Sequence, residues 1–548
     1  MPCPSFSNTV CTGDPTSWDS ATKWIRNCYE NHQNCLTISP FSAKASRLIS
    51  VGERIDFSDL RLETRPDTGW KHRYVALSHC WGSSLPLKLT QDNLQPFHER
   101  IPFDKLTQTF KDAVIATRKL TKDFDVRYLW IDAVCIIQDS NEDWANETAI
   151  TGDIYQTAFV TFAATFGSDG DVGLFQQRSS LSLSPCTVDA KWSQTNRHFV
   201  CEDRRALNSV VENSTLCSRA WVLQERTLSP RVLHFTAQQL FWECLGLDAC
   251  EAYPTKINET TGNNHFKMFS FETWKYERGM GPHHLEWNNA YLIWAQLVFR
   301  YTNSHLTRQS DKLIAIGGLA AKFQAHFGTN DEYLGGLWGT QIPAQLLWKV
   351  DRLPSGVDYP AEYRAPSWSW ASVDGRIDIL RQNSNYDTHY VEVLDHKIEY
   401  VKGNVALGVT YGRLRIRGFI NVLLGNLGVR SLEDVDRISR EPPTFPLEIL
   451  GKQFSKSHAH LQFDTTGGSF GNHRLCALAV ASFDGTMEGL IIRMTMDQRG
   501  EYQRCGLFEI RGAGESQAFL DAAKKLPLRH LEYEAVDDTA RTYTISMV

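Results

Sequence analysis

The chain has 548 residues, more than a single hydrophobic core usually organises, so its length predicts two or three domains. A hydrophobic share of 42% is ordinary for a soluble globular protein and excludes a largely disordered chain. The 57 Lys and Arg residues against 63 Asp and Glu residues give a net charge of -6, which argues against nucleic acid as the main partner.

The sequence points neither to a membrane nor to export. The N-terminus lacks a basic segment followed by an apolar one, so no secretory signal is predicted. The apolar stretch at 290–299 is shorter than the roughly 18 residues that span a bilayer, so no membrane span is expected. The 13 Cys residues are scattered and odd in number, which predicts reduced thiols and a cytoplasmic location.

Residues 1–70 are predicted to form a lead-in, in which residues 24–35 have a helical pattern. Three potential metal ligands fall on one helical face at the spacing i, i+4 and i+7: Cys28, His32 and Cys35. They could form a zinc site with Cys3 or Cys11 as a fourth ligand, or they could be core thiols beside a hydrogen-bonded histidine. The second interpretation is preferred, because structural zinc sites usually show paired close spacings on separate loops, and no metal ligand is assigned.

Residues 71–245 are predicted to form a doubly wound α/β domain. Strand-like runs alternate with helical patterns, and such alternation indicates right-handed crossovers and a parallel sheet. The expected strands are residues 74–80, 128–137 and 159–165, and the expected helices are residues 104–121 and the segment that follows Asp139. An irregular insertion at 166–217 and a hairpin of residues 231–235 and 239–244 complete this domain.

The remaining chain is predicted to form three segments. They are a linker or mobile loop at 246–289, a helical region at 290–350, and a β-rich region at 351–548 with a late helix at 518–525. A tryptophan-rich block at 363–375 is expected to be a strand that packs on the α/β domain.

Three tryptophan-bearing blocks stand out in the predicted α/β domain: residues 74–82, 128–138 and 218–226. Each joins an apolar run to polar residues that a buried strand does not favour. In doubly wound sheets, ligands bind beyond the carboxyl ends of the strands. The blocks are therefore predicted to be three pieces of one site.

The first block supplies four candidate ligand-binding residues at the end of its strand: Ser78, His79, Cys80 and Trp81. A cysteine and a histidine can form a thiolate–imidazolium couple. Adjacent residues on a strand point to opposite faces, however, so His79 is not expected to activate Cys80. The alternative is a packed strand end without chemistry.

The second block carries Asp132 within a predicted buried strand. An ionised aspartate there costs several kcal/mol unless it is paired, so a partner is expected in Arg219 or in backbone donors at a helix start. A structural ion pair and a functional carboxylate that holds a ribose or a metal both remain open.

The third block combines two guanidiniums, an amide and a carboxylate. Arg219 can bind a phosphate bidentately and Glu225 can hold a ribose hydroxyl, with Trp221 and Gln224 beside them. The alternative is a salt-bridge cluster that ties the domain to residues 230–350. The site is favoured slightly, because the other two polar blocks also need an explanation.

In this order and at this separation, the three blocks resemble the HET (heterokaryon incompatibility) domain of filamentous fungi, over residues 74–226. HET domains are distantly similar to TIR domains, which have a flavodoxin-like fold and some of which cleave NAD with a helical glutamate. That similarity implies a catalytic role for Glu147, one turn after Trp144. Asp132 and Glu225, selected from their own blocks, are the other candidate catalytic residues. Trp144 and Glu147 are one residue closer together than in TIR domains. A solvated helical glutamate is the alternative.

The resemblance implies a protein of fungal non-self recognition that acts as an effector of incompatibility-type cell death through NAD binding or cleavage. No cofactor is assigned, and NAD enters only as a substrate; self-association or a protein partner is expected. Two other functions stay open: a non-catalytic, self-associating signalling module, and a metabolic enzyme that reuses the fold.

Overall fold

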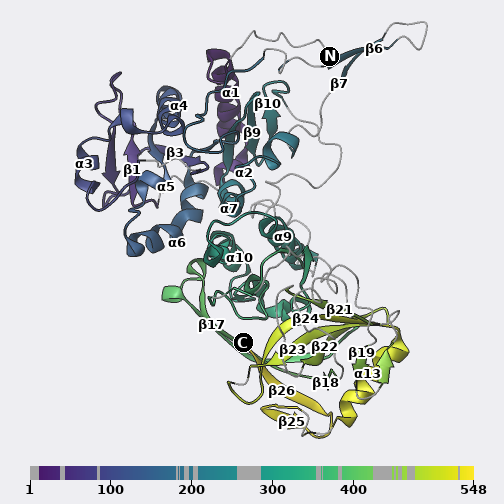
Figure 1. Cartoon of the computed structure of the whole chain (residues 1–548). Helices are drawn as coiled ribbons and strands as arrows, with labels where there is room; N and C mark the ends of the chain where they lie inside the picture. Colours follow the sequence, from purple (N-terminus) through teal and green to yellow (C-terminus); the bar gives the residue numbers. More distant parts are fainter. Residues whose placement is uncertain are drawn as a thin grey trace. The chain divides into compact units, whose positions relative to one another are not determined.

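The computed structural model divides the chain into two compact units, Met1–Pro282 and His283–Val548 (Figure 1). The structure describes residues 11–548 except 38–43, 83–86, 180–182, 184–185, 191–196, 202–207, 256–284, 353–358, 361, 380–385, 424–446, 450–451, 455–458, 466–474, 496, 527 and 529–530. The linker predicted at 246–289 therefore lies mostly outside the described residues. None of the described helices is both long enough and apolar enough to cross a bilayer.

The first unit is built on an eight-stranded sheet with the order β10-β9-β8-β5-β3-β4-β1-β2. Its strands are β1 Arg47–Ser50, β2 Arg61–Thr64, β3 Arg73–Ser78, β4 Val126–Trp130, β5 Val160–Ala163, β8 Arg231–Phe235, β9 Leu240–Cys244 and β10 Asp248–Cys250. The four central strands, β8, β5, β3 and β4, are parallel, and the strands on either side of them are antiparallel. The predicted α/β domain with a parallel central sheet is confirmed.

The described α-helices of this unit are α1 Pro15–Asn31, α2 Gln33–Thr37, α3 Leu94–Glu99, α4 Gln108–Phe124, α5 Asp132–Cys135, α6 Asn141–Thr157 and α7 Ala220–Leu228. The two crossover helices begin where the sequence supplies a cap. The Thr107 hydroxyl accepts a hydrogen bond from Phe110 N at the start of α4, and the Ser140 hydroxyl accepts one from Asp143 N at the start of α6. The two helices predicted between the strands are confirmed.

Helices cover both faces of the sheet. On one face, the His79 ring lies 5.0 Å from the Phe110 ring of α4, and the Phe162 ring of β5 lies 6.3 Å from Trp18 of α1. On the other face, Tyr74 of β3 donates a hydrogen bond to the Ile154 carbonyl of α6, and α6 packs on α7. Figure 1 shows α4 and α6 on opposite sides of β3.

The strand predicted over 128–137 is wrong beyond Trp130. The chain leaves the sheet there and forms the short helix α5, in which Asp132 is the first residue. A short apolar run does not distinguish a buried strand from a buried helical turn, and here the second half of the run is the turn. Two strands were also missed, β1 and β2, because they are short and come from the predicted lead-in.

The second unit has a helical part followed by a large sheet. The helices are α9 Leu285–Thr302, α10 Gly317–Phe327, α11 Ile342–Gln345 and, late in the chain, α13 Ala513–Lys525. Ten strands form the sheet: β15 Thr388–His389, β16 Val391–Tyr400, β17 Val409–Gly418, β18 Ile420–Val422, β21 Ala459–Phe463, β22 Leu475–Phe483, β23 Thr486–Met494, β24 Glu501–Arg511, β25 Ala535–Asp537 and β26 Thr542–Met547. The β-rich C-terminal region is confirmed.

Four two-stranded pieces lie outside the large sheets. They are β6 Cys186–Ala190 with β7 Arg197–Cys201, β11 Tyr333–Leu334 with β12 Leu337–Trp338, β13 Lys349–Arg352 with β14 Arg376–Asp378, and β19 Leu447–Ile449 with β20 Lys452–Phe454.

The tryptophan-rich block at 363–375 is not the predicted strand. It forms turns and a 3-10 helix, Trp370–Ser372, that is capped where the Ser369 hydroxyl accepts a hydrogen bond from Ala371 N. Trp370 is fully buried within the second unit, and its Nε1 donates to the Gly336 carbonyl at 2.8 Å. The alternating tryptophans imitate a strand pattern, whereas the serines between them supply hydrogen bonds for a turn.

Candidate functional site

The structure brings polar residues of all three blocks together where β3 and β4 end. Ser78 is the last residue of β3, Asp132 follows β4, and Arg219 is the N-cap residue of α7. Together with three neighbours they form what we call the strand-end cluster: Ser78, His79, Asp132, Tyr155, Arg219 and Glu225. The predicted convergence of the blocks is therefore present in the fold.

Glu225 has the most perturbed carboxyl group of the cluster. Burial raises its pKa to about 7, although the Ser78 hydroxyl and the charge of Arg219 act in the opposite direction. The charge of Asp132 adds to the increase, and the Tyr155 hydroxyl opposes it. A carboxyl group with such a pKa exchanges protons near neutral pH, which is the property of a general acid or base.

Ser78 and Tyr155 contribute the hydroxyl groups of the cluster. The Tyr155 hydroxyl donates to the Leu77 carbonyl at 3.2 Å, and burial raises the pKa of Tyr155 well above its usual value. The buried Ser78 Oγ has no hydrogen bond of ordinary length in the described structure, yet it lies near enough to Glu225 to favour the ionised carboxylate. Ser78 is therefore available to a ligand or to Glu225 itself.

Residues of the first two blocks donate hydrogen bonds to the Asp132 carboxylate. Its carboxylate accepts hydrogen bonds from Trp81 Nε1 at 2.8 Å and from Ala133 N at 2.7 Å, and it lies 3.8 Å from His79 Nδ1. Its side chain is 34% exposed, so the expected cost of a fully buried charge does not arise. Of the two partners considered, Arg219 forms no ion pair with Asp132 among the described residues, whereas a backbone donor at a helix start is present as Ala133 N of α5.

The His79 side chain is the buried imidazole of the strand-end cluster. Burial lowers its pKa, more strongly than the nearby Asp132 carboxylate raises it, so the imidazole is neutral near pH 7. Arg219 donates a hydrogen bond to the His79 carbonyl and so ties the start of α7 to the end of β3. His79 Nε2 has no hydrogen-bond partner among the described residues.

Cys80 lies on the other side of the chain from His79. Its side chain packs with Ala163, Leu216 and Val222, and burial raises the pKa of the thiol. The His79 ring instead packs on Phe110. The two side chains do not form a thiolate–imidazolium couple, as the alternation of strand residues predicts.

Glu147 is not part of the strand-end cluster. Burial raises its pKa, and its polar neighbours are Ser46 and Arg47 at the start of β1. Trp144 lies on the same helix and packs half-buried against the hydrophobic core. The structure thus separates the two residues for which the TIR similarity implied a role from Asp132 and Glu225.

Arg226, the last residue of the third block, takes part in a buried structural ion pair. Arg226 donates hydrogen bonds to both carboxylate oxygens of Glu243, at 2.8 and 3.1 Å, and His234 Nε2 lies 3.1 Å from the same carboxylate. These three side chains are almost fully buried. The alternative of a salt-bridge cluster thus applies to Arg226, whereas Arg219 and Glu225 face the strand ends.

The other two candidates of the third block lie on α7. Gln224 is buried and has polar interactions of its own, and Trp221 is half-buried. Neither appears among the groups that set the pKa of Glu225.

The cluster borders a very small cavity. It is lined by Ser78 and by residues of β5, β8 and α7, among them Thr161, Arg226 and His234. The cavity has room for roughly one water molecule. A nucleotide does not fit there in this conformation.

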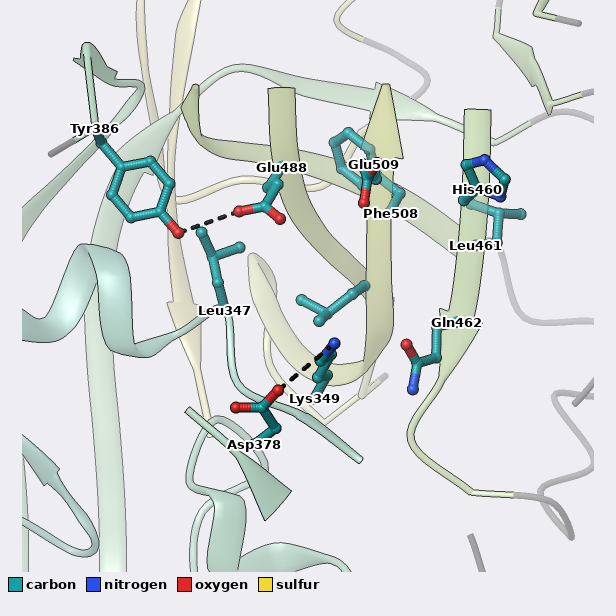
Figure 2. A pocket seen from close by; sticks show the side chains of 11 residues that line it. Leu347, Lys349, Asp378, Tyr386, His460, Leu461, Gln462, Glu488, Phe508 and Glu509 are labelled. Atoms are coloured by element: carbon teal, nitrogen blue, oxygen red, sulfur yellow. Dashed lines mark hydrogen bonds and ion pairs between the residues drawn. The ribbon is translucent and has the colours of Figure 1, made fainter. Parts of the chain in front are cut away.

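A larger pocket lies in the second unit (Figure 2), with a volume of about 100 Å³. Tyr386 donates to Glu488 at 3.1 Å, and Lys349 lies 3.6 Å from Asp378. Among the described ion pairs, only that of Lys349 and Asp378 joins two lining residues, because Tyr386 is a neutral donor to Glu488. Glu509 also lines the pocket, and its ion-pair partner Arg511 is not among the lining residues.

Tyr155 is a member of the strand-end cluster that the sequence analysis did not select. The signal was present, because a tyrosine on the buried face of a helix requires a polar partner for its hydroxyl. The position of that partner depends on the fold and is not contained in the helical spacing.

Comparisons with known proteins support one assignment. The family model described as Heterokaryon incompatibility protein (HET) matches residues 74–225, which contain all six residues of the strand-end cluster. No curated protein and no solved structure matches the chain. The resemblance inferred from the three blocks is confirmed, because residues 74–225 match the HET family model.

Proposed function

We propose that this protein is an effector of heterokaryon incompatibility whose HET domain cleaves the nicotinamide–ribose bond of NAD at the strand-end cluster. The observation that carries the proposal is the environment of Glu225, a carboxyl group with a pKa of about 7 among side chains from all three blocks. Catalytic groups are commonly those whose pKa values are moved towards neutrality by burial and neighbouring charge.

The chemistry of the cluster suits this reaction. Departure of nicotinamide leaves an oxocarbenium-like ribose, which a carboxylate such as Glu225 stabilises. Arg219 supplies a guanidinium for a phosphate, and Asp132 is exposed enough to accept a ribose hydroxyl. The proposal thus assigns the catalytic carboxylate to Glu225 and gives Glu147 a structural role.

The arrangement of the sheet also supports a nucleotide site. The parallel strands follow the order β4-β3-β5-β8, which corresponds to the order 2-1-3-4 of a flavodoxin-like sheet. In such sheets a ligand binds where the order reverses, and here that point lies between the ends of β3 and β5. Ser78, paired in register with Ala163, stands at that point.

Because the cavity is small, NAD binding at the strand-end cluster requires a conformational change of the domain. A dinucleotide reaches Glu225 only after the first turn of α7 moves away from β3 and breaks the contact between Arg219 and the His79 carbonyl. Self-association is the proposed trigger, since it gives a concentration-dependent switch.

The test is nicotinamide release from NAD by the purified full chain, over a range of protein concentrations that includes crowded solutions. We expect release by the wild type and a loss of about 100-fold or more for Glu225→Gln. Glu147→Gln is the matched control, a second buried helical glutamate, and should stay within a few-fold of the wild type. Circular dichroism and thermal unfolding establish that both variants fold. Absence of release under every condition, or equal rates for Glu225→Gln and the wild type, overturns the proposal.

A second function is favoured by the size of the cavity. The cavity beside the cluster has space for about one water, as expected for a non-catalytic module that signals by self-association. Cell killing in a fungal host separates the two functions. Glu225→Gln abolishes killing if the domain is an enzyme and leaves it intact if assembly alone is toxic.

A further inference from the structure

Four metal-ligating side chains meet at the end of β9, away from the strand-end cluster. They are Cys28 of α1, His32 at the end of that helix, Cys35 of α2 and Cys244 of β9. One potential ligand atom from each lies within 4.8 Å of the other three. The sequence favoured core thiols, with Cys3 or Cys11 as a fourth ligand only in the alternative of a zinc site; the fourth member is instead Cys244, more than 200 residues away in sequence.

The distances and the burial of this group match a closed tetrahedral site. The His32 Nδ1 atom lies 3.3 Å from the Cys244 Sγ atom, and the three cysteines are at most 2% exposed. Zinc–sulfur bonds of about 2.3 Å and zinc–nitrogen bonds of about 2.0 Å place neighbouring ligands roughly 3.5–3.8 Å apart. Closing the group around an ion therefore needs only small side-chain adjustments.

The break between α1 and α2 helps to form the group. A continuous helix would keep the spacing i, i+4 and i+7 on one face, but α1 ends at Asn31, and His32 leaves the helical conformation with φ -98° and ψ 90°. The chain then turns into α2, which carries Cys35. The ligands thus come from three separate elements, which lie side by side in Figure 1 as α1, α2 and β9.

A buried arginine provides the charge that such a site requires. Arg231 is completely buried and donates to the Cys35 carbonyl at 3.1 Å and to the Phe159 carbonyl at 3.2 Å. In the described part of the chain it has no carboxylate partner. A zinc ion with three thiolates and a neutral imidazole has a net charge of -1, which one guanidinium neutralises.

The loop after β9 is shaped around the imidazole. A Cβ atom at Gly246 would lie 2.8 Å from both Cγ and Nδ1 of His32, closer than side chains approach one another. On the other side of the ring, Asn27 Nδ2 lies 3.5 Å from His32 Nε2. The ring is therefore confined with Nδ1 towards the thiols, and partners of the second nitrogen commonly orient metal-binding histidines.

We propose that Cys28, His32, Cys35 and Cys244 bind one structural Zn²⁺ ion, with release of three thiol protons to solvent. Four protein ligands leave no open position, so the site is structural and not catalytic. It joins α1 and α2 to the edge of the sheet in place of a disulfide. The inference is independent of the proposed function, because none of these residues belongs to the strand-end cluster.

The first experiment measures metal in the full chain, purified under reducing conditions without chelators and analysed by inductively coupled plasma mass spectrometry. We expect about one zinc ion per chain for the wild type and for Cys135→Ser, a control that removes another fully buried cysteine of the same unit. Cys244→Ser should bind at least ten-fold less zinc. Equal zinc content in Cys244→Ser and the wild type overturns the proposal.

A second experiment needs no variant and so remains decisive if Cys244→Ser does not fold. Stepwise modification of wild-type thiols with a mercurial, in the presence of a zinc-sensitive dye, should release one equivalent of zinc as the cluster reacts. Co²⁺ replacing the zinc should give the visible spectrum of tetrahedral thiolate coordination. A wild-type protein that holds no zinc and takes up neither metal, or one whose intact mass reveals a disulfide among the three cysteines, contradicts the proposal.

Discussion

The ion pair between Arg226 and Glu243 allows a stability prediction with a definite size. Replacing Arg226 with methionine removes two hydrogen bonds, of 2.8 and 3.1 Å, from a carboxylate that is 1% exposed. His234 Nε2 remains 3.1 Å from the Glu243 carboxylate. The variant therefore takes away the guanidinium charge that lies directly against this buried carboxylate.

Loss of one partner of a buried ion pair costs about 3–5 kcal/mol, so we expect Arg226→Met to lose about 4 kcal/mol of unfolding free energy. Replacing both partners removes the uncompensated charge as well. The double variant Arg226→Met/Glu243→Met should thus recover most of the loss, since an apolar pair of similar volume is often as stable as a buried ion pair.

Native-state hydrogen exchange, read from peptides of β8 and β9, measures this free energy in the first unit alone. A loss of about 4 kcal/mol corresponds to an opening constant raised roughly 1000-fold. The control is Arg61→Met, which breaks a 2.6 Å ion pair with Glu63 whose side chains are 45% and 26% exposed, and it should cost less than about 1 kcal/mol. A loss below 1 kcal/mol for Arg226→Met, or a double variant less stable than the single one, refutes the reasoning.

Three further predictions concern single residues. Burial raises the pKa of Glu225 from 4.5 to about 7, so the native state binds more protons at this residue than the unfolded state does. The contribution of Glu225 to stability is therefore lost as pH rises through about 7. Urea titrations should show a smaller pH dependence of stability between pH 4.5 and 7 for Glu225→Gln than for the wild type. Gly246→Ala should displace the His32 ring and speed zinc loss to a chelator, whereas an unchanged rate would count against the site. Gly489→Ala should destabilise the second unit by about 1–3 kcal/mol in urea, because the new Cβ would lie 2.2 Å from the Leu478 carbonyl oxygen; an unchanged midpoint would show that the strand can shift.

The sequence predicted correctly those strands and helices whose local hydrophobic pattern matches the element that the fold forms there. The strand at 74–80 and the helix at 104–121 correspond to β3 and α4, because each has a clear period and an ordinary boundary. The strand prediction for the apolar run at 128–137 was wrong in part, because half of this run is a buried turn that has the same composition as a strand. The short strands β1 and β2 were missed because β2 pairs with β1, and the pairing of β1 with β4 depends on residues far along the chain.

The site was predicted as a set of blocks but not as a set of contacts. Asp132 was expected in a buried strand, paired with Arg219 or with backbone donors at a helix start; it is instead the first residue of α5, where Trp81 and the backbone N of Ala133 donate to it. Cys28, His32 and Cys35 could be selected from their spacing, but the fourth member, Cys244, joins them only through the packing of β9. Local spacing identifies candidates within one element, whereas convergence of elements distant in sequence is decided by the tertiary structure.

Two adjacent residues of α7 determine how the strand-end cluster can open. Glu225 faces the strand ends, whereas Arg226 is fixed to Glu243 of β9 by a pair that costs several kcal/mol to break. At the start of the same helix, the half-exposed Arg219 is joined to β3 by a hydrogen bond to a neutral carbonyl, and such bonds contribute only about 1–3 kcal/mol. Opening that admits a ligand should therefore begin at the Arg219 end of α7 and proceed as a rotation about its fixed Arg226 end, which moves Glu225, the proposed catalytic carboxylate, the least.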